Sequence, residues 1–224
     1  MNVSPVPKPN SDKKGISSLR KIACTSMFSK VAEGFLKDWF LEDIGGSIDK
    51  SQYSGEKGTG TEHLLLKLVD RALGMLDENP DKTAVLAVGV DWEKAFDRID
   101  PFVCASRFIS MGLRPSLVPI LLSYLSERTM TVKVNDTVSG VYELIAGAGQ
   151  GTVLAQLAYN VANSSVANDV NPEDRFKYSD DLNFLELVKF SDKLTEYDVL
   201  KHVPSDVSLS QKFLEPSSAQ AQTT

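Results

Sequence analysis

The chain has 224 residues, enough to bury a core in one domain or two subdomains, and its 42% hydrophobic and 24% charged residues are ordinary for a globular protein. It has no apolar run long enough to span a membrane, and its two distant cysteines and two histidines argue against a disulfide framework or a zinc site. A net charge of −6 argues against generic nucleic-acid binding, although residues 1–37 carry a local net charge of +5. A reducing, intracellular compartment fits this cysteine usage.

The first third of the chain is predicted to contain a tail, two helices and a loop. Residues 1–18 are rich in Pro, Ser and Lys without periodicity, which predicts a disordered tail. Apolar spacing predicts a helix over residues 22–39. Residues 54–61 (SGEKGTGT) lack the Gly-Lys-Ser/Thr ending of a nucleotide-binding P-loop, so we interpret them as a connector. A helix follows over residues 61–76, with Thr61 as its expected N-cap.

The middle of the chain is predicted to mix strands and helices. Residues 83–91 are almost all apolar and end in Asp91, which predicts a buried strand with an acid at its edge. Taken alone, this aspartate is better explained as the cap of the next turn. Two helices are expected at residues 102–111 and 116–126, and a hairpin at 130–135 and 138–145. A loop with three glycines, residues 147–152, then leads into an apolar helix over residues 153–166.

Residues 175–185 alternate apolar and polar side chains on both sides of Asp180 and Asp181, which predicts a β-hairpin with the aspartates at or beside its turn. An isolated Asp-Asp pair is usually an exposed turn, whereas two carboxylates fixed at a strand end suit Mg²⁺. An amphipathic segment is expected at residues 185–200 and a disordered end at 215–224. Because the helices and strands do not alternate regularly, the order favours an α+β fold.

Three motifs in this order resemble those of reverse transcriptases, in particular the polymerases of non-LTR retrotransposons. They are residues 90–97 (VDWEKAFD), 150–154 (QGTVL) and 178–181 (YSDD), and residues 121–128 resemble a further stretch common in these elements. The resemblance covers residues 19–188. It implies right-hand fingers, over about 19–82 and 113–149, and a palm, over about 83–112 and 150–190, whose sheet carries the catalytic aspartates.

The resemblance implies an RNA-directed DNA polymerase that adds deoxynucleotides to a primer by two-metal phosphoryl transfer. Asp91, Asp180 and Asp181 would be catalytic and, with the Trp92 carbonyl, would hold two Mg²⁺ or Mn²⁺ ions. The implied substrate-contacting residues are Trp92, Phe96, Gln150, Gly151, Tyr178, Arg20 and Lys57. An RNA template with a DNA primer and deoxynucleoside triphosphates would be the partners, without a membrane, in the nucleus or cytoplasm.

Three of these roles have plain alternatives. Tyr178 would support the primer end, or it only packs within its strand. Phe96 would exclude a 2′-hydroxyl, or it is a core aromatic residue on a helix. Arg20 would reach the triphosphate, or it is a solvated charge.

The chain also departs from the family pattern. Gly149 replaces the usual proline before Gln150, Ala155-Gln156 replaces a glycine-proline pair, and residues 54–61 lack both arginines of the family's fingers loop. Residues 191–224 are expected to be a truncated segment after the palm, without a thumb, so that thumb or endonuclease regions would belong to a longer polyprotein. Two alternatives therefore stay open: a degenerate, catalytically silent retroelement fragment, and a non-enzymatic palm-like module that binds RNA or protein.

Overall fold

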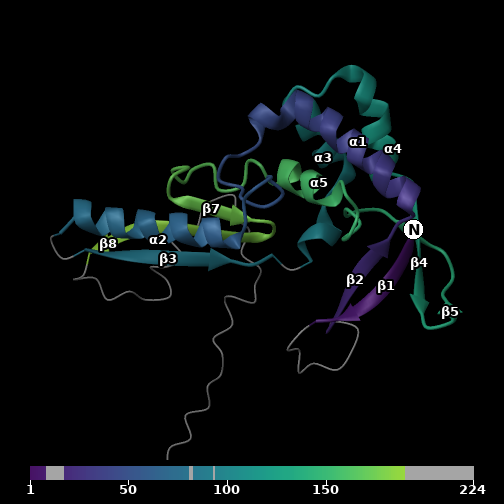
Figure 1. The fold of residues 1–224 in the computed structure, drawn as a ribbon, viewed down its shortest axis with the longest axis horizontal. Coiled ribbons are helices and arrows are strands. Elements are labelled where there is room, and N and C mark those ends of the chain that lie inside the picture. Colours follow the sequence, from purple (N-terminus) through teal and green to yellow (C-terminus); the bar gives the residue numbers. More distant parts are fainter. Residues whose placement is uncertain (9–17, 81–82, 93, 190–224) are drawn as a thin grey trace, which may run out of the picture.

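The structure, a computed structural model, describes residues 1–8, 18–80, 83–92 and 94–189 (Figure 1). These residues form two β-sheets and five α-helices. Three of the strands and the long helix α2 make one part of the molecule, and the remaining helices and strands make the other (Figure 1). Within the described ranges, no helix combines the length and apolar character needed to cross a membrane. The mixed α+β class predicted from the sequence is confirmed.

The first sheet has the antiparallel order β3-β8-β7, and its strands are β3 (Thr83–Val90), β7 (Arg175–Tyr178) and β8 (Asp181–Lys189). Tyr178 pairs with Asp181, so only Ser179 and Asp180 form the turn between β7 and β8. The helix α2 (Thr61–Glu78) runs along one face of this sheet (Figure 1). Its Leu64 and Met75 are buried in one cluster with side chains of β7 and β8. The predicted strand and hairpin are both confirmed, but the strand is not buried as predicted: α2 covers one face of the sheet, and of the described β3 side chains only Val90 is buried while Ala87 is exposed.

Four helices enclose the largest core of the described residues. They are α1 (Met27–Ile44), α3 (Pro101–Ser110), α4 (Val118–Leu125) and α5 (Ala155–Ala162). Short 3₁₀ turns lie at Gly45–Ser47, Ala95–Arg98 and Pro115–Leu117. Phe40 of α1 meets Phe108 of α3 edge to face at 5.5 Å between ring centroids, and both side chains are buried. Full burial of one such side chain contributes about 1.5–3 kcal/mol, and Leu154 and Ala155, at the start of α5, are buried in the same core.

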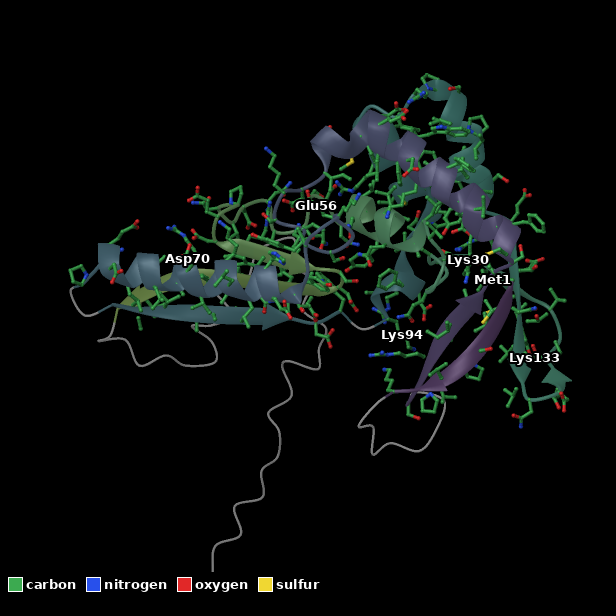
Figure 2. All side chains as sticks on the ribbon, viewed as in Figure 1. Met1, Lys30, Glu56, Asp70, Lys94 and Lys133 are labelled. Atoms are coloured by element: carbon green, nitrogen blue, oxygen red, sulfur yellow. The ribbon has the colours of Figure 1, made fainter. Side chains whose placement is uncertain are left out.

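The second sheet holds the N-terminus. Its strands are β1 (Asn2–Pro7), β2 (Leu19–Cys24), β4 (Arg128–Val134), β5 (Thr137–Val138) and β6 (Tyr142–Leu144). β1 is antiparallel to β2 and parallel to β4, while β5 and β6 both pair with β4. The amino group of Met1, labelled in Figure 2, donates to the Thr129 carbonyl at 2.6 Å. The hairpin predicted over residues 130–145 is confirmed.

Several local predictions are wrong. Residues 2–7 form a strand, not a disordered tail, because β2 and β4 satisfy their backbone groups from far along the chain. Residues 22–24 belong to β2, so the predicted first helix begins only at Met27, after the N-cap Ser26. Gly60, not Thr61, is the N-cap of α2. Residues 185–189 continue β8, and the segments predicted at 190–200 and 191–224 lie outside the described residues.

Candidate active site

Three carboxylates gather at one end of the β3-β8-β7 sheet. Asp91 follows β3 directly, Asp180 lies in the β7–β8 turn, and Asp181 begins β8. Val90 pairs with Leu182 in antiparallel strands, so the residue after Val90 and the residue before Leu182, Asp91 and Asp181, lie beside one another at the sheet end. Both aspartates, together with Tyr178 and the start of α2, line a hollow of about 400 Å³. This volume is within the range of small-molecule sites, about 300–1,000 Å³.

The electrostatics show that Asp180 and Asp91 act on Asp181. Burial, and then the charges of Asp180 and Asp91, raise the pKa of Asp181 above its usual range. The pKa of Tyr159, on α5, is also raised by burial and then by the three carboxylates. Among the described residues, no Lys or Arg forms an ion pair with any of these three aspartates. The site therefore carries concentrated negative charge that a bound cation would neutralise.

The donor atoms suit a hard cation, but their arrangement is not a ready-made cage. Carboxylate oxygens are the ligands that Mg²⁺ prefers. In the part of the chain that the structure describes, no three His, Cys, Asp or Glu side chains converge closely enough to hold a metal ion. The site thus fits a divalent ion in the chemistry and charge of its side chains, although they do not form a preassembled set of ligands.

The glycine-rich loop before α5 is fixed by close backbone packing. Gly147 has φ +90°, and a Cβ there would lie 2.9 Å from backbone atoms of Phe96 and Asp97. Gly151 has φ +104°, and a Cβ there would lie 3.1 Å from the Ala23 carbonyl oxygen. Ala23 also donates its N–H to the Gln150 carbonyl at 2.7 Å. These glycines therefore allow the loop to pack against the segment after Asp91 on one side and β2 on the other.

The start of α5 is capped by a residue from α1. The buried carboxylate of Glu33 accepts hydrogen bonds from the N–H groups of Val153 and Leu154, at 2.7 and 3.2 Å. A carboxylate here satisfies orphan N–H groups and complements the positive end of the helix dipole. The capping Glu33 was not predicted, because its partners lie 120 residues away and no local pattern connects them.

The other predicted substrate residues are spread around the site. Phe96 stacks at 4.8 Å on Tyr159 and packs against the main core, which agrees with the core-aromatic alternative. Trp92 packs against a small buried cluster that includes side chains of β3 and β8. Gln150 lines a second, smaller hollow beside β2. Arg20, on β2, and Lys57, in the loop before α2, are exposed and do not line the hollow of the carboxylates.

A buried group of ion pairs joins the hairpin strand β7 to the loop after α1, and it was not predicted from the sequence. Asp49 accepts from Lys177 at 2.7 Å and from Arg175 at 3.1 Å, and all three side chains are less than one tenth exposed. Burial raises the pKa of Asp49, but the Lys177 and Ser51 hydrogen bonds and the two positive charges hold it below its usual range. Arg175 and Lys177 lie two residues apart and therefore on the same face of β7. Two positive charges on one face of a predicted strand were the signal from which the buried ion pairs could have been predicted.

Two known proteins are similar to this chain in sequence. The chain is 28% identical, over 178 residues, to an RNA-directed DNA polymerase from the mobile element jockey of Drosophila melanogaster, covering 74% of the chain and 19% of that protein. It is 29% identical, over 157 residues, to a probable RNA-directed DNA polymerase from transposon BS of the same species, covering 69% of the chain and 17% of that protein. The chain is homologous to the reverse transcriptases of non-LTR retrotransposons. It spans about a fifth of the length of these relatives. No protein-family model matches it.

Solved structures share the fold of this reverse-transcriptase homologue. The apo telomerase of Candida tropicalis, truncated from its C-terminal domain, superposes with a TM-score of 0.56 at 14% identity, covering 89% of the chain and 45% of that protein. The same telomerase in complex with a fragment of telomeric RNA gives a TM-score of 0.57 at 13% identity, covering 95% and 39%. At such low identity, these matches establish the fold alone.

Proposed function

We propose that the chain forms the fingers and palm of a reverse transcriptase, with the β3-β8-β7 sheet as the palm. The observation that carries this proposal is the meeting of Asp91 with Asp180 and Asp181 at one sheet end, from two elements about 90 residues apart in the sequence. In this division the fingers comprise residues 19–82 and 113–149. The reaction would be the addition of deoxynucleotides to a DNA primer on an RNA template.

The aspartates are the groups that would hold the ions. Two divalent ions, Mg²⁺ or Mn²⁺, would stabilise the attacking and leaving oxygens of an in-line displacement at phosphorus. In our proposal Asp91 and Asp180 would hold the ions, Asp181 would support them, and the Trp92 carbonyl would supply a further oxygen. The pKa of Asp181 is raised first by burial and then by the charges of Asp180 and Asp91, and the second part supports this assignment, because a bound cation would relieve the repulsion among the carboxylates.

The surrounding residues would bind and orient the substrates. Tyr178 shares the hollow with Asp91 and Asp181, which suits a contact to the primer end. The stacking of Phe96 on Tyr159 holds its ring in place, as a sugar-discriminating residue requires. Gln150 and Gly151 would contact the incoming nucleotide, and Arg20 and Lys57, both exposed, would meet its phosphates.

A primer-extension assay tests the proposal. The purified chain is incubated with an RNA template, an annealed DNA primer and deoxynucleoside triphosphates, in Mg²⁺ and in Mn²⁺. We expect extension that Asp91→Asn and Asp180→Asn each abolish. Asp136→Asn, an exposed turn residue between β4 and β5, is the matched control and should leave extension unchanged. Extension that survives Asp180→Asn would contradict the mechanism. No extension by the wild type in either ion would favour the catalytically silent fragment.

A further inference from the structure

The turn that carries Asp180 is held by two hydrogen bonds to one buried amide side chain from outside the hairpin. The Gln52 Oε1 accepts the Ser179 N–H at 3.0 Å, and its Nε2 donates to the Ser179 carbonyl at 3.3 Å. Gln52 is only 6% exposed. Both backbone groups of the residue before Asp180 are therefore bound by a single side chain.

The amide side chains of Gln156 and Asn160 complete a closed ring of hydrogen bonds. The Ser179 Oγ donates to Gln156 Oε1 at 3.2 Å, and Gln156 Nε2 donates to Asn160 Oδ1 at 2.8 Å. Asn160 Nδ2 donates to the Ser54 carbonyl at 2.9 Å, and the Ser54 N–H donates to Gln52 Oε1 at 3.1 Å. The ring joins the loop before α2, the first turns of α5 and the hairpin turn.

The backbone conformation of Ser179 explains why these hydrogen bonds are needed. Its φ is +56°, a left-handed conformation that a non-glycine residue adopts at a cost and keeps only when its surroundings fix it. The loop that supplies Gln52 is itself anchored on β7. The Lys177 N–H donates to the Ser51 carbonyl, and the Tyr53 N–H donates to the Lys177 carbonyl, each at 2.8 Å. The Asp49–Lys177 ion pair lies behind these bonds.

We propose that Gln52 and Gln156 are positioning residues, which hold the Ser179 turn so that the Asp180 carboxylate faces Asp91. This inference rests on the proposed function, since it assigns Asp180 as a metal ligand. Neither amide lines the hollow, so both act through the turn. Groups that orient a metal ligand typically change metal affinity 10–100-fold when removed. The loop before α2 thereby has a structural role at the site, beyond that of a connector.

Two measurements on the full chain test the inference. The first is Mn²⁺ affinity, from the electron paramagnetic resonance signal of free Mn²⁺. The second is hydrogen exchange at the Ser179 and Asp180 amides. We expect Gln52→Ala to weaken Mn²⁺ binding about 10-fold or more and to speed exchange at the Ser179 amide. Gln52→Glu keeps the acceptor and loses the donor, so it should protect the Ser179 amide better than Gln52→Ala. Lys50→Ala, exposed in the same loop, should change neither measurement.

Gln156 is tested through the bond it shares with Ser179. Gln156→Ala and Ser179→Ala each remove the 3.2 Å hydrogen bond, so their effects on Mn²⁺ affinity should be similar and the double variant should add little. Additive effects would show that Gln156 acts elsewhere, and that would overturn its assignment.

The outcomes separate the inference from the function it rests on. If Asp180→Asn abolishes Mn²⁺ binding and Gln52→Ala leaves it within twofold of wild type, the positioning role is wrong although the metal site stands. If Asp180→Asn leaves binding unchanged, the proposed metal site is wrong. Amide exchange then tests by itself whether Gln52 holds the Ser179 turn. Faster exchange at the Ser179 amide in Gln52→Ala supports this role, and unchanged exchange overturns it. Retained protection of α3 amides in each variant shows that the fold is intact.

Discussion

Replacing Asp49 by Asn tests the ion-pair group behind the hairpin. The carboxylate accepts hydrogen bonds from Lys177, Arg175 and the Ser51 N–H, at 2.7, 3.1 and 3.0 Å. The substitution leaves two cations in a site where both side chains are about 5% exposed. Removing one partner of a buried pair typically costs about 3–5 kcal/mol, because the other charge stays buried and unpaired. We expect a loss in the free energy of unfolding at the lower end of this range, since Asn keeps one acceptor.

Urea denaturation followed by circular dichroism measures this loss. For a slope of about 2–3 kcal/mol/M, the midpoint should fall by about 1–2 M. Asp136→Asn, in the exposed β4–β5 turn, is the control and should shift the midpoint very little. Adding Lys177→Met to the Asp49→Asn chain removes one of the two buried positive charges and should recover part of the stability. A loss below about 1 kcal/mol, or a further loss on adding Lys177→Met, would refute the reasoning.

The pH dependence of this loss has a definite sign. The pKa of Asp49 in the folded chain is lowered below the unfolded value of about 3.9. A lowered carboxyl pKa stabilises the fold above the unfolded pKa, and this contribution is lost as the pH falls through the folded pKa. The difference between wild type and Asp49→Asn should therefore be the same at pH 5 and pH 7 and should shrink only below about pH 4.

Three further predictions concern the surroundings of the carboxylates. Glu33→Ala leaves two N–H groups at the start of α5 without their acceptor and should cost about 1–3 kcal/mol in urea denaturation, whereas Asp38→Ala, exposed on the same helix, should cost little. Gly147→Ala should cost at least about 2 kcal/mol from its backbone clash and its φ of +90°, while Gly34→Ala, in open space within α1, should be neutral or stabilising. Asp181→Asn should stabilise the metal-free chain at pH 7 by less than about 1 kcal/mol, because the residue is largely exposed and only part of its carboxylate is desolvated. This gain in the free energy of unfolding should vanish near pH 3, since a raised folded pKa penalises the fold only as the pH rises through it. A gain equal at both pH values would contradict the last prediction.

Local patterns in the sequence were sufficient to predict the hairpin and the strand β3, although not how exposed β3 is. Period-two alternation around Asp180-Asp181 predicted β7 and β8, and an apolar run predicted β3, because each pattern lies within one element. The order of the motifs then indicated that Asp91 joins the pair. The register of β3 on β8 agrees with that expectation.

Long-range partners explain what was missed. Strand β1 has the composition of a disordered tail, with prolines at positions 5 and 7, and it forms because all six of its residues pair with β2 and its first two also pair with β4, about 129 residues away. The groups that hold the site, Asp49, Gln52 and Glu33, meet their partners 120–128 residues along the chain. A buried polar residue of this kind has no periodic neighbour, so only the folded structure reveals its role.

The number and affinity of Mn²⁺ ions bound by the isolated chain test the central claim most directly, because binding depends on the carboxylates at the sheet end and not on the rest of a polymerase. Electron paramagnetic resonance of the wild type is compared with Asp91→Asn and Asp180→Asn, each with and without a deoxynucleoside triphosphate. We predict that either substitution removes the tight site, since the two aspartates come from separate elements and share one ion. Tight binding that persists in both variants would contradict the account.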